Sequence, residues 1–162
     1  MPDFPKEGIL FYDITTLLKD PIAFREVIDR LTAPFVDKQI EKVVSIESRG
    51  FIFGAPLSER LKAGFVPVRK PGKLPSDQID ETYQLEYGSN RLCLHQDAVS
   101  AGERVLIIDD LLATGGTAAA TVNLVKRLGG EIVGVAFVIE LLFLKGREKL
   151  KDLPVVSLLT YE

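Results

Sequence analysis

Two adjacent carboxylates precede a loop of small residues in VLIIDDLLATGGT, residues 105–117. Asp109 and Asp110 end an apolar run typical of a buried strand, and 113–117 lead into a helical pattern. The first amides of a helix lack partners within the helix and stand at the positive end of its dipole, so such a loop can bind phosphate. A pair of acids suits ribose hydroxyls or hydrated Mg²⁺. The segment therefore predicts a sugar phosphate ligand.

Each residue of the predicted phosphate loop has a part in this interpretation, beginning with Ala113 at the strand end. Gly115 and Gly116 allow the backbone to approach a phosphate closely, and the hydroxyls of Thr114 and Thr117 add donors. The loop has neither the Gly-Lys-Ser/Thr of a Walker loop nor a dinucleotide G-x-G-x-x-G. ATP hydrolysis and hydride transfer are therefore disfavoured. The alternative is that the acid pair and the glycine pair are ordinary solvated turns.

The rest of the chain supplies elements that can position this loop. Apolar segments of strand length alternate with helical patterns, which predicts an α/β fold with a mostly parallel sheet flanked by helices. At 162 residues a single domain is expected. We expect a small N-terminal hood over about 1–35, a core over about 36–162 and a lid over about 69–90. The predicted strands are 42–48, 64–70, 103–110, 131–141 and 154–161, and the predicted helices are 21–36, 51–63 and 117–128.

Composition excludes several classes of partner. The formal net charge is −3, so no global positive field favours nucleic acid or an acidic membrane surface. Cys93 is the single cysteine, and no apolar run approaches the length of about 18 residues that spans a bilayer. The N-terminal sequence MPDFPKEG lacks the pattern of a secretory signal. We therefore expect a cytoplasmic protein without nucleic-acid or membrane partners.

The segment VLIIDDLLATGGT resembles the phosphoribosyl pyrophosphate (PRPP) motif of the type I phosphoribosyltransferases. PDFPKEGILFYDIT, ESRGFIFGAPL, RKPGKLP, YQLEYG and LKGREKL extend the resemblance over essentially the whole chain, to the branch that uses adenine. The resemblance implies the fold of that family and transfer of the 5-phosphoribosyl group from PRPP to N9 of adenine. The products would be AMP and pyrophosphate, and Mg²⁺ would be required.

Two other functions stay open at this stage. One is a phosphoribosyltransferase for another base, although we find no lysine placed to meet the carbonyl of a 6-oxopurine. The other is a non-catalytic PRPP sensor, which would have no need of YQLEYG or the cationic RKPGKLP.

The resemblance assigns roles around PRPP. Residues 113–117 would cradle the 5′-phosphate, while Asp109 and Asp110 would hold the ribose hydroxyls. The metal would be carried by the substrate and reach these acids only through water. Ser48 and Arg49, in ESRG, would meet the pyrophosphate, in a loop that in the family often contains a non-proline cis peptide.

The resemblance also gives the lid a role. Arg69, Lys70 and Lys73 would neutralise the pyrophosphate while the lid excludes water. In the family a cation from this segment reaches the pyrophosphate of a neighbouring subunit, which implies a homodimer.

In the hood, Phe11 would stack on the base, while the backbone around Leu10 and Tyr12 would read its edge. A basic residue commonly occupies the position of Tyr12 in the family, so side-chain contacts there are expected to differ.

Glu86 is the candidate catalytic residue. Burial beside Tyr83, Tyr87 and a purine would raise its pKa, so that it could hydrogen-bond the base or move a proton as N9 attacks. The alternative is that Glu86 pairs with Lys70 or Lys73 and only holds the lid.

Overall fold

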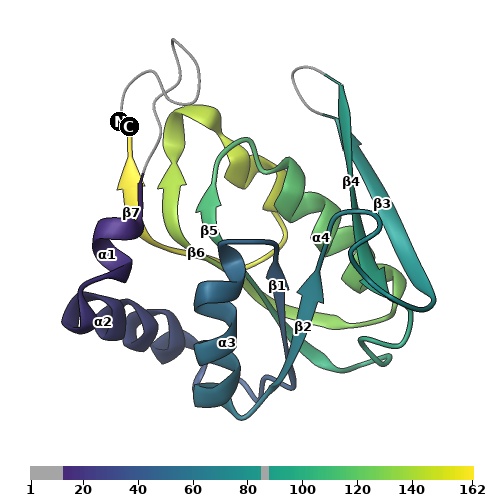
Figure 1. Cartoon of the computed structure of the whole chain (residues 1–162), viewed down its shortest axis with the longest axis horizontal. Helices are drawn as coiled ribbons and strands as arrows, with labels where there is room; N and C mark the ends of the chain where they lie inside the picture. The colour runs from purple at the N-terminus through teal and green to yellow at the C-terminus, as the bar shows by residue number, and fades with distance from the viewer. Residues whose placement is uncertain (1–12, 85–87) are drawn as a thin grey trace.

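The computed structural model describes residues 13–84 and 88–162, and its centre is a five-stranded parallel sheet (Figure 1). The strand order is β2-β1-β5-β6-β7, and every neighbouring pair is parallel. The predicted α/β fold with a parallel sheet is therefore confirmed. The strands are β1 (Lys42–Ile46), β2 (Gly64–Val68), β5 (Arg104–Leu112), β6 (Glu131–Leu141) and β7 (Val155–Tyr161).

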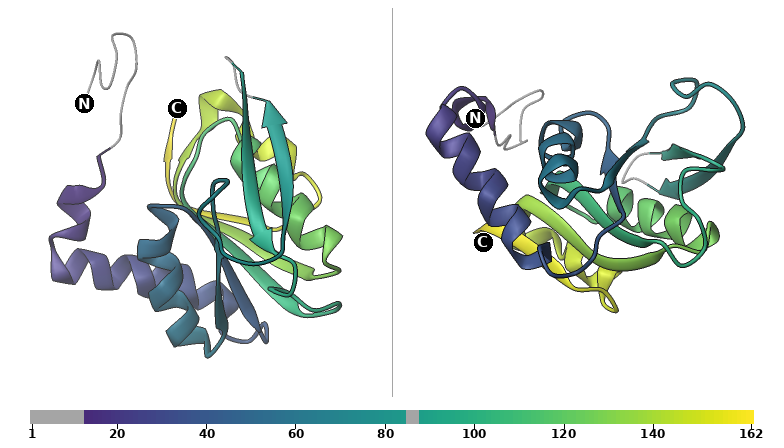
Figure 2. Two further views of the ribbon diagram at one scale, coloured as in Figure 1. Left: turned by 45° about the vertical axis from the view of Figure 1, so that its right-hand side comes forward. Right: turned by 90° about the horizontal axis from the view of Figure 1, so that it is seen from below.

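Alternation along the strands divides the interior into two cores. Neighbouring side chains on a strand point to opposite faces, so Val43 and Leu106 join one core while Val44 and Ile107 join the other. Helices α2 (Pro21–Thr32) and α3 (Gly50–Leu61) cover the first face, and α4 (Gly116–Arg127) covers the second (Figure 2). Burial on both faces explains why these strands read as continuous apolar runs.

The described part of the N-terminal region packs against the sheet and α3. Helix α2 follows the short helix α1 (Thr15–Leu18), and its Ile28 and Leu31 are buried in the same core as Phe53 of α3. The Asp20 side chain caps α2 by accepting hydrogen bonds from the amides of Ile22 and Ala23 at 2.9 and 3.1 Å. Pro34 predicts an end or a kink within the helical stretch 21–36, and this is confirmed: α2 ends at Thr32, and Ala33–Phe35 forms a 3₁₀ turn.

The predicted lid contains regular structure. Strands β3 (Gln78–Gln84) and β4 (Ser89–His95) form an antiparallel hairpin beside α4 (Figures 1 and 2). The amide of Asn123 on α4 donates to Glu81 at 3.0 Å, and Arg127 donates to the Asp80 carbonyl at 2.6 Å. The hairpin is therefore docked on the helix that begins at the predicted phosphate loop.

The sheet places the candidate site where its connections diverge. From β1 the chain passes through α3 to β2 on one side, whereas β5, paired on the other side of β1, leads through α4 to β6. Ligands of open α/β sheets bind at this point, beyond the carboxyl ends of the strands. β5 runs two residues past the predicted end at Asp110, because Leu111 and Leu112 continue the pairing with β6.

The close approach of α3 to β1 gives a stability prediction. A Cβ on Gly54 would lie 2.3 Å from Ser45 Oγ and 2.6 Å from Ser45 Cβ, so rotation of the serine cannot relieve the clash. We expect Gly54→Ala to lower the free energy of unfolding by about 1–3 kcal/mol. Urea denaturation measures this change. Ala55→Ser, at an exposed position of the same helix, is the control, and a Gly54→Ala protein as stable as that control would contradict the prediction.

Candidate functional site

A pocket of about 470 Å³ lies at the carboxyl ends of β1 and β5. The loop after β1, the loop between β5 and α4, and the β3–β4 hairpin form its walls. The structure thus brings together most of the described residues that the sequence nominated. These are Ser48, Arg49, Lys70, Asp109, Asp110, Ala113, Thr114, Gly115, Gly116 and Thr117.

The phosphate loop has the geometry that its glycines suggested. Gly115 has φ +78°, in the left-handed region, and α4 begins at the next residue, Gly116. A Cβ on Gly115 would also lie 2.4 Å from the Gly146 carbonyl oxygen, so a side chain is excluded twice. The start of this 12-residue helix lines the pocket and offers amides to an anion.

The acid pair is organised by an ion pair with the loop after β1. Arg49 Nε lies 2.7 Å from Asp110 Oδ2, and the Asp110 side chain is only 7% exposed. Arg49 and Asp110 lie 61 residues apart in sequence, so this contact joins the carboxyl ends of β1 and β5. The predicted partner of Arg49, the pyrophosphate, would have to share this guanidinium with Asp110.

The Asp109 carboxyl has a pKa raised well above its ordinary value. Burial is the main cause, and the neighbouring charge of Asp110 adds to it. The Asp110 amide donates a hydrogen bond to Asp109 Oδ1 at 2.8 Å, which limits the effect. Ribose hydroxyls that donate hydrogen bonds to Asp109 would stabilise its charged form. Asp109 would therefore bind such hydroxyls.

The loop after β1 contains a cis peptide bond between Glu47 and Ser48, as the resemblance implied. Glu47, which the sequence analysis did not nominate, accepts hydrogen bonds from Arg69 Nε at 2.9 Å and the Lys70 amide at 3.1 Å. Burial opposes ionisation of Glu47, but the hydrogen bonds from Arg69 and Lys70 outweigh it and lower its pKa. Arg69 therefore ties the base of the lid to this loop. Its guanidinium also lies 5.9 Å from the Phe51 ring centroid.

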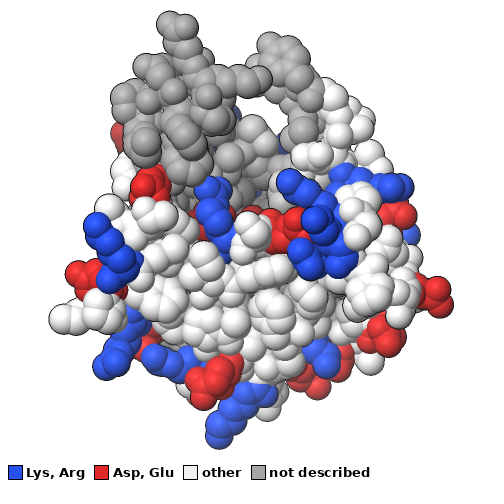
Figure 3. Space-filling view, in the orientation of Figure 1, with Lys and Arg blue, Asp and Glu red and all other residues white. Residues whose placement is uncertain are grey.

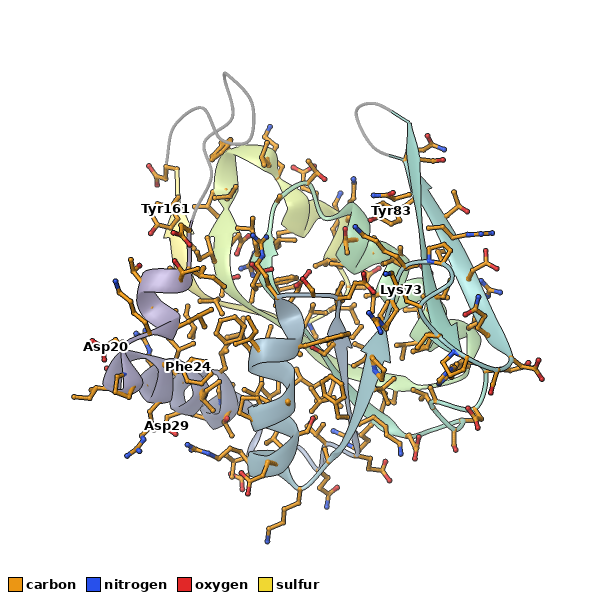
Figure 4. The ribbon with its side chains drawn as sticks, viewed as in Figure 1. Asp20, Phe24, Asp29, Lys73, Tyr83 and Tyr161 are labelled. Atoms are coloured by element: carbon orange, nitrogen blue, oxygen red, sulfur yellow. The ribbon has the colours of Figure 1, made fainter. Side chains whose placement is uncertain are left out.

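Basic side chains gather over the segment between β2 and β3 (Figure 3). Of the predicted lid cations, Lys70 lines the pocket, whereas Arg69 and Lys73 do not. Lys73 is exposed in the connection that precedes the hairpin (Figure 4).

Tyr83, on β3, lines the pocket. The sequence had suggested Tyr83 only as a neighbour of Glu86 and not as a residue of the pocket. Its hydroxyl accepts a hydrogen bond from Thr117 Oγ1 at 3.1 Å. A Cβ on Gly116 would lie 3.1 Å from the Tyr83 ring, so the hairpin packs directly on the start of α4. The alternation of Tyr83, Leu85 and Tyr87 in the sequence could have predicted a strand here, but the predicted strands did not include this segment.

Leu10, Phe11, Tyr12 and Glu86 fall in 1–12 and 85–87, outside the described residues, and their roles stay predictions. Among the described residues, no group of three or more His, Cys, Asp or Glu side chains could hold a metal ion. Two carboxylates such as Asp109 and Asp110 suit a metal ion that brings its other oxygen ligands with it, as substrate oxygens and water. In the described parts of the chain, no helix combines the length and apolarity needed to cross a membrane.

Comparison with known proteins agrees with this geometry. The phosphoribosyl transferase domain family matches residues 15–160. The chain therefore belongs to the phosphoribosyltransferase family.

Within that family, its similar relatives are adenine phosphoribosyltransferases. The adenine phosphoribosyltransferase of Koribacter versatilis is 59% identical over 162 residues, covering 100% of this chain and 89% of the relative. The crystal structure of the Thermoanaerobacter pseudethanolicus enzyme superposes with a TM-score of 0.96 at 50% identity, covering 99% of this chain and 94% of the other. The Saccharomyces cerevisiae enzyme, complexed with an imino-altritol bisphosphate and adenine, gives a TM-score of 0.91 at 46% identity, covering 98% and 92%.

The raised pKa of Asp109 predicts a pH-dependent stability. Between the ordinary pKa of 3.8 and the raised value, the folded protein binds a proton that the unfolded chain has lost. This contribution to the free energy of unfolding therefore falls as pH rises through that window, and the deficit persists above it. Asp109→Asn removes the titration, so we expect its melting temperature to exceed that of wild type near neutral pH and the difference to shrink in acid.

Thermal unfolding followed from about pH 4 to pH 8 measures this difference. Asp97→Asn, at an exposed position, is the matched control. A melting temperature for Asp109→Asn at or below that of wild type throughout would contradict the prediction.

Proposed function

We propose that this protein transfers the 5-phosphoribosyl group from PRPP to N9 of adenine, producing AMP and pyrophosphate. One observation carries the proposal: the Asp109–Asp110 pair and the start of α4 line the same pocket, at the point where the connections after β1 and β5 leave to opposite sides of the sheet. This pocket offers amides to a phosphate and carboxylates to sugar hydroxyls a few residues apart. The 59% identity to the K. versatilis adenine phosphoribosyltransferase supports adenine as the base.

In this proposal the 5′-phosphate binds residues 113–117, and the ribose hydroxyls bind Asp109 and Asp110. Loss of pyrophosphate from the anomeric carbon builds positive charge on the ribose ring and negative charge on the leaving oxygen. The carboxylates stand beside the ribose, where they favour the positive charge. Fixed groups of this kind need no reorganisation when the charge develops, which lowers the barrier.

The pyrophosphate would lie toward Ser48 and Arg49 and the cationic base of the lid. Lys70 already lines the pocket, and Arg69 holds the backbone of this segment through Glu47. Mg²⁺ bound to PRPP would supply further neutralisation of the leaving group, with Asp109 and Asp110 holding its water shell. Closure of the lid, including Lys73, would exclude water from the cationic ribose.

A panel of bases tests the reaction directly. The protein is incubated with PRPP, Mg²⁺ and either adenine, guanine, xanthine or orotate, and pyrophosphate release is measured. Release with adenine alone is the expected result. Release with another base would instead support a different phosphoribosyltransferase, and PRPP binding without release would support a sensor.

The proposed role of Glu86 predicts a loss of turnover. Glu86→Gln keeps a hydrogen-bonding side chain but cannot accept a proton, so we expect kcat to fall by roughly 10²–10⁴-fold if Glu86 moves a proton. The affinity for AMP should change far less, because the amide still reaches the base.

Glu81→Gln is the matched control, since Glu81 also falls in the predicted lid segment 69–90 but binds α4 and does not line the pocket. Near-normal turnover in Glu86→Gln would show a structural residue. Parallel loss of AMP binding and turnover in both variants would point to lid docking instead.

A homodimer and a cytoplasmic location complete the proposal. Ile52 and Phe65 are each 38% exposed, and Phe65 packs edge-on against Phe51, beneath the Arg69 guanidinium. A second copy covering this apolar surface would stand next to the lid cations, as the family resemblance implies. The buried free thiol of Cys93 is consistent with a reducing compartment.

The dimer gives a further prediction. Phe65→Asp would place a charge in the proposed interface, so we expect the mass measured by light scattering to fall from that of a dimer to that of a monomer. Ile22→Asp, at a position 79% exposed on α2, is the control and should stay dimeric. A monomeric wild type, or a dimeric Phe65→Asp protein, would contradict this interface.

A further inference from the structure

The turn after β6 presses its backbone against the phosphate loop. This turn comprises the 3₁₀ segments η2 (Leu142–Leu144) and η3 (Gly146–Leu150), and it lies beside the start of α4 (Figure 1). A Cβ on Gly146 would lie 2.2 Å from the Ala113 carbonyl oxygen and 2.9 Å from the Gly115 amide nitrogen. In return, a Cβ on Gly115 would lie 2.4 Å from the Gly146 carbonyl oxygen. The two backbones therefore touch with no room for a side chain on either.

An ion pair between the exposed Arg147 side chain and the buried Glu140 carboxylate fixes the position of Gly146. The next residue, Arg147, donates from Nε to Glu140 Oε1 at 2.9 Å and from Nη2 to Glu140 Oε2. Glu140, at the end of β6, is 2% exposed and also accepts a hydrogen bond from Ser157 Oγ at 2.7 Å. Arg147 Nη1 reaches the Val155 carbonyl on β7 at 3.1 Å. The hydrogen bonds from Arg147 and Ser157 hold the pKa of Glu140 below its ordinary value despite burial.

This arrangement joins a rigid support to the ligand-binding loop. A two-point arginine–carboxylate contact fixes orientation as well as distance, which a lysine does not. Its carboxylate belongs to β6, an interior strand of the sheet, so the guanidinium and the adjoining Gly146 are held in a fixed position relative to the sheet. Arg147 and Glu140 do not line the pocket, so any effect on the ligand must pass through Gly146.

We propose that Gly146, held by the Arg147–Glu140 ion pair, sets the conformation in which the phosphate loop binds the 5′-phosphate. Gly146 and Arg147 are thus positioning residues for that one subsite. The inference rests on the proposed function to the extent that residues 113–117 bind phosphate. The alternative is that the ion pair only stabilises the junction of β6 and β7.

Gly146→Ala separates these explanations because it leaves the ion pair intact and pushes a methyl group into the phosphate loop. Gly146 does not have a positive φ, so alanine adds no backbone strain there. Gly64→Ala is the matched control: Gly64 also lacks a positive φ, and its Cβ would meet the flexible Lys42 side chain at 3.2 Å. Arg147→Lys is a second variant that keeps the charge but loses the two-point contact, and it tests the inference even if Gly146→Ala does not fold.

Titration calorimetry of the full chain measures the dissociation constants for ribose 5-phosphate and for pyrophosphate, and steady-state kinetics gives kcat and the KM for PRPP. For Gly146→Ala we expect about tenfold weaker ribose 5-phosphate binding, equivalent to about 1.4 kcal/mol, and a similar rise in KM. Pyrophosphate binding and kcat should stay within about twofold, as for Gly64→Ala, and Arg147→Lys should show a smaller loss of the same selective kind.

Ribose 5-phosphate binding equal to that of Gly64→Ala in every folded variant would overturn the inference, as would equal weakening of both ligands. A lower melting temperature with unchanged ligand binding would also overturn it, because it would show a purely structural ion pair. If the wild type binds ribose 5-phosphate but forms no AMP, the proposed function fails while the selective effect on the phosphate loop is still measurable. If the wild type binds no ribose 5-phosphate, the phosphate-loop assignment fails, and this inference with it.

Discussion

Parallel pairing of β1 with β5 is the constraint on which the site depends. It brings the loop that follows each strand to the same edge of the sheet, although Ile46 and Leu112 are far apart in the chain. The connections from these two strands then leave in opposite directions, so no helix covers the space between the loops. The Arg49–Asp110 ion pair closes the base of that space and fixes one loop relative to the other. The two loops that form walls of the pocket therefore start from β1 and β5, which are buried on both faces.

Two of the acids that line this pocket pair with arginines, and the third has no arginine partner at ion-pair distance among the described residues. Asp110 pairs with Arg49 and Glu47 with Arg69, whereas Asp109 is half-buried next to another acid and resists ionisation. A carboxyl whose charged form is unfavourable gains the most stabilisation when it accepts hydrogen bonds from a substrate. The surroundings that make the Asp109 carboxylate unfavourable in the folded protein are therefore the ones that favour its proposed hydrogen bonds with the ribose hydroxyls.

Two pieces of distant sequence complete the phosphate loop from opposite sides. The β3–β4 hairpin reaches Thr117 through the Tyr83 hydroxyl, and the turn after β6 reaches Gly115 through Gly146. The turn is attached to the sheet by the contact of Arg147 with the buried Glu140 carboxylate. The hairpin is attached to α4 by exposed polar contacts such as Glu81–Asn123, and its Leu92 and Leu94 are buried in the core that α4 covers.

The sequence by itself determined the features that depend on local order. Strand-length apolar runs and helical periodicity predicted the α/β fold, and the acids followed by a glycine-paired loop predicted a phosphate site. Turns and periodicities can be read in this way because they are properties of neighbouring residues. Resemblance extended this to the loop containing Ser48 and Arg49. Only the tertiary structure decided that Arg49 binds Asp110, that Arg69 binds Glu47 and that Gly146 excludes a side chain at Gly115. These contacts join residues far apart in the chain, and they follow from strand order and from how turns pack, which no local pattern encodes.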